Sequence, residues 1–259
     1  MKILSIDLDF ISGPAINSYH HTDISFPANE YYMHGDVNPV IKWRRILDNY
    51  PAIAESSYKI NIKNYQFCLR TFLRALENCQ DVHFGYDHDN ILYGLEGHTD
   101  IEVINIDHHS DLLCGAMGSI AEEKDIVEHD IVSEGNWGYL LQSQGRLKSF
   151  TWILNPTSEE WNDTIVGKEQ INNFKYDTID SYKFEDYNFD QIFVCLSPGY
   201  VPPYHWHMFG TFLTLYEEKT GNVIDIKKLH RKYEYKKYYQ GVTNYITEGT
   251  HIGKKKDIY

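Results

Sequence analysis

The chain has 259 residues, of which 42% are hydrophobic, and its formal net charge is −13. The hydrophobic content excludes a wholly disordered chain, and the length suits one large α/β domain. The acidic balance argues against a nucleic-acid-binding protein, which would carry a basic surface, and it suits a metal enzyme or a cationic substrate. We therefore expect a single domain over residues 1–259 that binds no nucleic acid.

The segment 1–12 is apolar but contains Asp7 and Asp9, so it lacks the unbroken apolar stretch of a signal peptide. No window of the sequence approaches the ~18 apolar residues of a membrane helix. The chain has four cysteines, Cys68, Cys79, Cys114 and Cys195. None of them forms a Cys-x-x-Cys pair, which excludes a zinc ribbon or thioredoxin motif. We expect a cytoplasmic protein with no membrane partner.

The first predicted element is a buried strand at Lys2–Ile6, an apolar run that leads into two aspartates. A stretch rich in Tyr, His and Asn follows at about 12–48, and we interpret it as a loop insertion that shapes a cleft. Tyr65–Asn78 has apolar side chains at helical spacing and predicts an amphipathic helix. A second buried strand is predicted at Val82–Tyr86.

The third predicted strand is Ile101–Ile106. Asn136–Gln144 indicates a short helix, and strands are predicted at Phe150–Leu154 and Gln191–Leu196. The segment from about 227 is a Lys- and Tyr-rich tail. Strands that alternate with helices predict an α/β fold with a mostly parallel sheet, covered by helices on both faces.

Acidic and histidine side chains follow three of the predicted strands. They are Asp7, Asp9, His88, Asp107, His109 and Asp111. The carboxyl ends of parallel strands meet at one edge of a sheet, where binding sites form. In extended backbone, alternate residues point the same way, so Asp107, His109 and Asp111 should converge while His108 and Ser110 turn aside.

Four carboxylates and two imidazoles at one edge would repel strongly without cations. Two divalent ions, bridged by carboxylates, resolve this repulsion. Oxygen-rich ligation with one imidazole per ion favours Mn²⁺ over structural zinc. Because two such ions activate a water near neutral pH, the predicted reaction class is metal-assisted hydrolysis.

With these residues in place, a resemblance is visible. Asp107-x-His109-x-Asp111 resembles the Asp-x-His-x-Asp motif of the arginase (ureohydrolase) superfamily. Tyr86-Asp87-His88 resembles its Gly-Gly-Asp-His segment, and Ser5-Ile6-Asp7-Leu8-Asp9 resembles its Ser-hydrophobic-Asp-hydrophobic-Asp segment. Ordinary arginases carry the Asp-x-Asp pair late in the chain, so the strand order here looks permuted. That order, together with Gly135-Asn136-Trp137, is similar to an arginase-related family that includes peptide arginases.

The resemblance implies a three-layer α/β/α sandwich, arginase-like with permuted strand order, and a pair of Mn²⁺ ions. One ion would take His88, Asp107, Asp111 and Asp7. The other would take His109, Asp107, Asp7 and Asp9. The implied reaction is hydrolysis of the guanidinium group of an arginine in a precursor peptide, giving ornithine and urea.

Three further residues are candidates for the reaction. Asn136 follows the ligand motif where arginases place a substrate-binding asparagine, and it is equally well interpreted as a helix N-cap. Tyr200 follows the last predicted strand and should lie at the same edge as a substrate-binding residue. His205 comes shortly after it, and its imidazole could shuttle protons near neutral pH.

Four other interpretations use the same residues. Asp107-His108-His109 spells the motif of two-manganese DHH phosphoesterases, although the later Gly-Gly-Gly-His segment of that family is missing. A deacetylase-like amide hydrolase would share the fold but use one metal. Asp7-Leu8-Asp9 resembles haloacid-dehalogenase phosphatases, but Ile11 stands where they carry Thr or Val. The non-enzymatic alternative is a metal-stabilised binding module.

Overall fold

The computed structural model describes residues 1–11, 43, 48, 59–112, 135–155, 158, 171, 173–225 and 229. The predicted loop insertion at 12–48 therefore lies outside the described residues except for positions 43 and 48. Of the predicted tail from 227, the structure describes Leu229, which packs in the hydrophobic core at 9% exposure.

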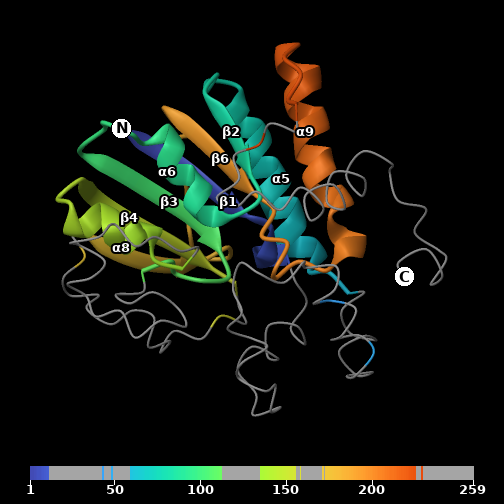
Figure 1. Cartoon of the computed structure of the whole chain (residues 1–259), viewed down its shortest axis with the longest axis horizontal. Coiled ribbons are helices and arrows are strands. Elements are labelled where there is room, and N and C mark those ends of the chain that lie inside the picture. Colours follow the sequence, from blue (N-terminus) through green and yellow to red (C-terminus); the bar gives the residue numbers. More distant parts are fainter. Residues whose placement is uncertain are drawn as a thin grey trace.

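The described residues include one six-stranded sheet with the order β2-β6-β1-β3-β4-β5, in which all neighbouring strands run parallel (Figure 1). The strands are β1 (Lys2–Asp7), β2 (Val82–Gly85), β3 (Ile101–Asp107), β4 (Leu147–Leu154), β5 (Phe174–Thr178) and β6 (Gln191–Cys195). The five predicted strands are confirmed, with bounds that differ by three residues or fewer.

The edge strand β5 has no counterpart among the predictions. Its sequence, Phe-Lys-Tyr-Asp-Thr, alternates apolar and charged residues, and none of its side chains is fully buried. An edge strand has only one neighbour in the sheet, so it lacks the continuous apolar run of a central parallel strand. Only the pairing with β4 defines it as a strand.

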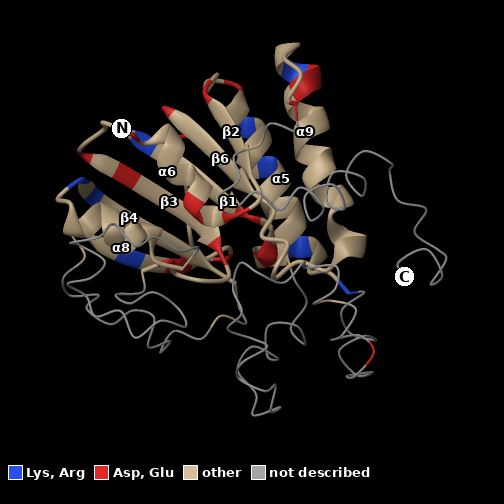
Figure 2. Ribbon diagram, viewed as in Figure 1, with Lys and Arg blue, Asp and Glu red and all other residues tan. Residues whose placement is uncertain are grey.

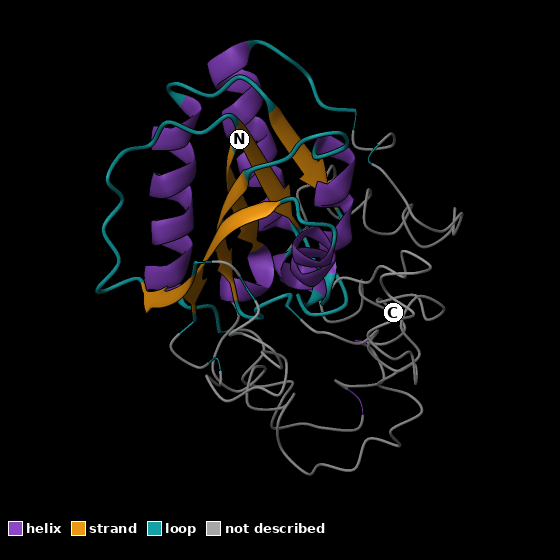
Figure 3. Cartoon of the chain, turned by 90° about the vertical axis from the view of Figure 1, so that its left-hand side faces the viewer, coloured by secondary structure: helices purple, strands orange, loops and turns teal. Residues whose placement is uncertain are grey.

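Helices lie on both sides of the sheet (Figure 3). The α-helices are α5 (Ile62–Leu76), α6 (Ile91–Gly94), α8 (Trp137–Ser143) and α9 (His207–Thr220), and the 3-10 helices are η1 (Leu8–Ile11), η2 (His88–Asn90) and η5 (Pro203–His205). The two predicted helices correspond to α5 and α8. The sequence analysis missed α9, whose many Phe and Thr residues are weak helix formers in isolation. Tertiary packing of its aromatic side chains stabilises it instead.

A hydrophobic core lies on each face of the sheet, between the sheet and the helices that cover it. One core packs α5 and α9 on one face of the sheet, through side chains such as Phe72 and Phe212, whose ring centroids lie 5.2 Å apart. The other core packs α6 and α8 on the opposite face, through side chains such as Leu140 and Phe150. The predicted α/β architecture with a covered parallel sheet is therefore confirmed, and its arrangement is a three-layer α/β/α sandwich.

The strand order places a topological switch point between β1 and β3. The chain leaves β1 through α5 toward β2, on one side of the sheet, and leaves β3 through α8 toward β4, on the other side. The two strands are direct neighbours, with Ser5 opposite Asn105 and Ile6 opposite Ile106. Diverging connections from adjacent parallel strands open a crevice at their carboxyl ends, which is where ligands bind in such sheets.

The helix α5 supports the end of β1. Asn61 accepts a hydrogen bond from the backbone of Asn64 at 3.1 Å and so caps the helix. The Asn64 side chain, fully buried, donates to the carbonyl of Phe10 in η1 at 2.9 Å. These contacts hold the backbone that carries Asp9.

Candidate metal centre

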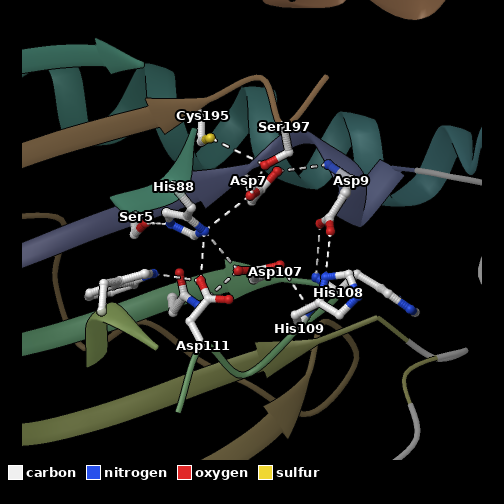
Figure 4. Close-up of polar contacts among 12 residues, drawn as sticks. Ser5, Asp7, Asp9, His88, Asp107, His108, His109, Asp111, Cys195 and Ser197 are labelled. Carbon is white, nitrogen blue, oxygen red and sulfur yellow. Dashed lines mark hydrogen bonds and ion pairs between the residues drawn. The ribbon is translucent and has the colours of Figure 1, made fainter. Parts of the chain in front are cut away.

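The six predicted ligands come together at the carboxyl ends of β1 and β3 (Figure 4). Figure 2 shows acidic residues where these two strands end. The side chains of Ser5 and Asp7 on β1, and of Asn105 and Asp107 on β3, alternate with apolar core residues that face α5 and α9. They therefore point to the α6 and α8 side of the sheet, because side chains alternate along a strand.

We call Asp7, His88, Asp107 and Asp111 the His88 group. The Nδ1 atom of His88 lies 3.0 Å from Asp7, 3.1 Å from Asp107 and 2.7 Å from Asp111, measured to the Oδ2 atom of each carboxylate. All four side chains are at most 5% exposed. The His88 group is therefore closed to solvent.

We call Asp9, Asp107 and His109 the His109 group. The Nδ1 atom of His109 lies 2.8 Å from Oδ2 of Asp9, and the backbone amide of His109 donates to Oδ1 of Asp107 at 2.8 Å. The His109 side chain is 25% exposed, whereas that of Asp9 is 3% exposed. The His109 group therefore opens to solvent past the imidazole.

Each group can bring one ligand atom per residue to a common point. In the sets Asp7-His88-Asp107 and Asp9-Asp107-His109, the ligand atoms lie within 4.8 Å of one another. Asp107 belongs to both sets, and its two carboxylate oxygens contact different groups. Asp107 thus belongs to both sets, which is the arrangement expected of a shared ligand, whereas Asp7 belongs only to the first set. The role of Asp107 as a ligand of two ions stays a prediction.

One observation shows that these residues fit a cation. The Nδ1 atom of His88 is surrounded by three carboxylates, yet it makes no hydrogen bond of acceptable geometry with any of them. A single N–H cannot satisfy three acceptors, whereas a cation among them can bind the nitrogen and the oxygens together. This orphaned buried atom is what distinguishes the His88 group from an ordinary buried ion pair.

Burial and mutual repulsion shift the pKa values of the carboxylic acids upward. Burial, followed by the charges of Asp111 and Asp7, raises the pKa of Asp107 to about 7. Burial and the charge of Asp107 raise the pKa of Asp9 to about 6. For Asp7, burial and the nearby Asp9 raise the pKa more than His88 lowers it. Without cations, the charged forms of these carboxylates are costly, so the site favours their protonated forms.

The pKa values of the two imidazoles are also raised, which favours their charged form. Burial lowers the pKa of His109, but the charge and hydrogen bond of Asp9 outweigh this effect and raise the pKa to about 9. Burial also lowers the pKa of His88, but attraction by its surrounding carboxylates raises it well above the usual range. In the absence of a metal, protons on both histidines therefore neutralise part of the negative charge.

Four polar side chains outside the predicted set touch the ligands. Ser5 lies 2.6 Å from Nε2 of His88, Ser197 donates to Asp7, Asn105 donates to Asp107 at 3.1 Å and Trp137 donates to Asp111 at 2.6 Å. The signal for Ser5 and Asn105 was present in the sequence, because each stands two residues before a ligand aspartate and so points the same way. Trp137 and Ser197 are distant in sequence from the aspartates that they contact, and only the tertiary fold brings them together.

The backbone at Asp111 differs from the extended chain that the sequence analysis assumed. Asp111 has a φ of 56°, in the left-handed region, and the chain after β3 no longer has strand geometry. This turn directs Asp111 toward His88 while His109 faces Asp9. Ser197 also has a left-handed φ, of 47°, and directs its hydroxyl at Asp7. Such strain persists where surrounding contacts hold it, and here it surrounds the site.

The less specific candidates lie as follows. Tyr200 contacts His109, with ring centroids 4.9 Å apart, so it lies at the open side of the centre. Asn136 is fully buried at the N-cap position of α8, but its side chain makes no capping hydrogen bond. His205 is buried in η5 beside the ring of Tyr204. The predicted substrate role of Asn136 and proton-shuttle role of His205 stay predictions.

His108 has turned aside from the metal-ligand positions, as the sequence analysis expected. Its ring nitrogen lies 3.2 Å from the hydroxyl of Ser158, and its ring packs edge-on against His109. Its backbone amide donates to Oδ1 of Asp9 at 3.2 Å. The His108 side chain therefore packs against the ring of His109 and does not point to the ligand positions.

Comparison of the chain with protein-family models, with curated proteins and with solved structures finds no match. Among the helices that the structure describes, none combines the length and the apolar character needed to span a membrane.

Proposed function

We propose that this protein is a binuclear manganese hydrolase that cleaves the guanidinium group of arginine residues in a precursor peptide, giving ornithine and urea. The observation that carries the proposal is the position of Asp107, which belongs both to the closed His88 group and to the open His109 group. The arginase-like motifs of the sequence supply the choice of reaction, and the permuted strand order is part of the same proposal. We keep the cytoplasmic location as a prediction.

The residues present suit a pair of Mn²⁺ ions. The His88 group would hold one ion and the His109 group the other, because each combines hard carboxylate oxygens with one imidazole. When bound, the two ions supply an activated water for attack on the guanidinium carbon. When cations bind, they displace the protons from the carboxylates whose pKa values are raised.

The chain's own residues would orient the substrate. The net negative charge of the whole chain, −13 before ions bind, attracts a cationic guanidinium group in preference to a neutral amide or a phosphodiester. The His109 group is the open side, so the substrate approaches there, beside Tyr200. The aromatic face of Tyr200 offers a surface on which a guanidinium can stack. Asn136 keeps its predicted role as a substrate contact, although its side chain is fully buried in this structure.

The test is incubation of the Mn²⁺-loaded protein with free arginine and, separately, with an arginine-containing peptide. The expected product has lost ~42 Da per arginine with release of one urea, as hydrolysis by an activated water requires. Controls are the same protein treated with a chelator and the Asp107→Asn variant. Absence of urea from both substrates, together with hydrolysis of a phosphodiester, would replace the proposal with the DHH-type phosphoesterase; acetate release from an acetyl-lysine peptide would favour the deacetylase-like alternative.

A further inference from the structure

Trp137 contacts two members of the His88 group at once. Its indole Nε1 donates a hydrogen bond of 2.6 Å to Oδ2 of Asp111. Its ring lies 5.1 Å from the His88 ring, centroid to centroid, and is tilted by 43°. The Trp137 side chain is fully buried, and its ring centroid lies 5.8 Å from that of Phe150. A bulky residue with one polar atom is thus placed so that this atom meets a ligand carboxylate.

The first turn of α8 also holds the backbone of Asp111. The amide of Gly138 donates to the carbonyl of Asp111 at 3.1 Å. A Cβ atom on Gly138 would lie 2.8 Å from the Leu112 side chain and 3.1 Å from that carbonyl, so a side chain here would require both neighbours to shift. Asp111 needs such support, since an L-residue in the left-handed region costs roughly 1–2 kcal/mol.

Together these contacts fix Asp111 in position and orientation. The indole N–H occupies one lone pair of Oδ2 and leaves the other lone pairs of the carboxylate for a cation. The face of the indole limits rotation of the His88 imidazole, whose far nitrogen, Nε2, is held by Ser5 at 2.6 Å. Outer partners of this kind orient ligands and typically change metal affinity 10–100-fold.

We propose that Trp137 is the positioning residue that sets the metal affinity of the His88 group, through its hydrogen bond to Asp111. This inference rests on the proposed metal centre and extends it to a residue that binds no ion itself. The contacts of Trp137 described above are with Asp111 and His88, which both belong to the His88 group, so we expect its effect on one of the two ions.

The test compares Trp137→Phe with Trp206→Phe in the full-length protein. Trp206 is a matched control, because it is also fully buried and its indole donates to a backbone carbonyl, that of Val201, at 2.7 Å. Mn²⁺ binding is followed by the electron paramagnetic resonance signal of the free ion. Trp137→Phe should weaken one of the two dissociation constants about 10–100-fold. Trp206→Phe should change neither constant, while thermal unfolding of both metal-free variants reports the packing cost.

Three outcomes overturn the inference: unchanged Mn²⁺ affinity in Trp137→Phe, equal weakening of both ions, or the same weakening in Trp206→Phe. They differ from failure of the proposed function, which would appear as a wild-type protein that binds no pair of ions. A second measurement serves if Trp137→Phe does not fold. In the wild type, the indole N–H resonance furthest downfield among the five tryptophans should shift most with the first equivalent of Zn²⁺. A larger shift at another indole, or none, would contradict the inference.

Discussion

The two sides of Asp107 face different surroundings. On the side of Oδ2, His88 and three carboxylates are at most 5% exposed, and Ser5, Ser197 and Trp137 contact them. On the side of Oδ1, the His109 side chain is 25% exposed and lies against Tyr200. The His88 side of the centre is therefore buried like a protein interior, and the His109 side is partly exposed to solvent.

This difference suggests a division of labour between the halves. Buried polar partners arranged before a cation arrives reduce the cost of binding it, so the His88 group should bind the first ion more tightly. An exposed half gives a substrate access but leaves its ligands less constrained. The His109 group should therefore bind the second ion more weakly and lie next to the reaction.

The largest expected effect is the loss of both halves at once. Asp107→Asn removes one negative charge from the shared ligand, so we expect metal content to fall from two ions to none and urea release to disappear. Plasma mass spectrometry of the gel-filtered protein measures the metal. Asp186→Asn is the control, because this exposed carboxylate contacts Lys2 at the opposite end of β1 from Asp7, at 2.8 Å, and accepts from the backbone amide of Asn188. Two ions retained by Asp107→Asn would contradict the shared role.

Replacing each histidine in turn separates the halves. His88→Ala should weaken the tighter ion at least ~100-fold, since loss of a direct ligand exceeds the effect of an outer partner. It should also destabilise the metal-free protein by about 3–5 kcal/mol, because three buried carboxylates lose their cationic neighbour. His109→Ala should weaken only the other ion and cost less stability. Isothermal titration with Mn²⁺ measures the affinities, and urea unfolding measures the stabilities. Identical affinities and stabilities in the two variants would contradict the difference between the two groups.

The smallest effect is a dependence on pH in the metal-free protein. The pKa is raised from 3.8 to about 6 for Asp9 and to about 7 for Asp107, and from 6.5 to about 9 for His109. Each group therefore stabilises the fold below its unfolded pKa, and this stability is lost as the pH rises through the folded pKa. Stability should fall from pH 4 to pH 9, by less than the sum of the separate groups, because these neighbouring groups share protons and do not titrate one by one.

Saturating Mn²⁺ should reverse this trend, because cations bind the deprotonated carboxylates and neutral imidazoles. Urea unfolding between pH 4.5 and 9, in chelator and in Mn²⁺, measures both curves. A metal-free protein that gains stability between pH 5 and 7.5 would show that the carboxylates are not held in the repulsive cluster seen here.

Much of the fold could be predicted from hydrophobic periodicity. The central strands are continuous apolar runs because both of their faces are buried, and α5 carries one apolar stripe because only one side of it packs. Those signals failed at β5, an edge strand with mixed residues, and at α9, a helix of aromatic and Thr residues. Both elements owe their structure to neighbours that are distant in the sequence, β4 for the one and α5 for the other.

The sequence by itself determined the ligand types and the strand ends on which they stand, because side-chain alternation and strand polarity are local properties. Asp107 as a common ligand was implied by the resemblance to arginases and stays a prediction. Only the tertiary structure decided which group each ligand joins, that one group is closed and the other open, and that Trp137 and Ser197 reach the carboxylates. Those features depend on the left-handed turn at Asp111 and on segments up to 190 residues apart, such as Asp7 and Ser197, which meet only when the sheet is assembled.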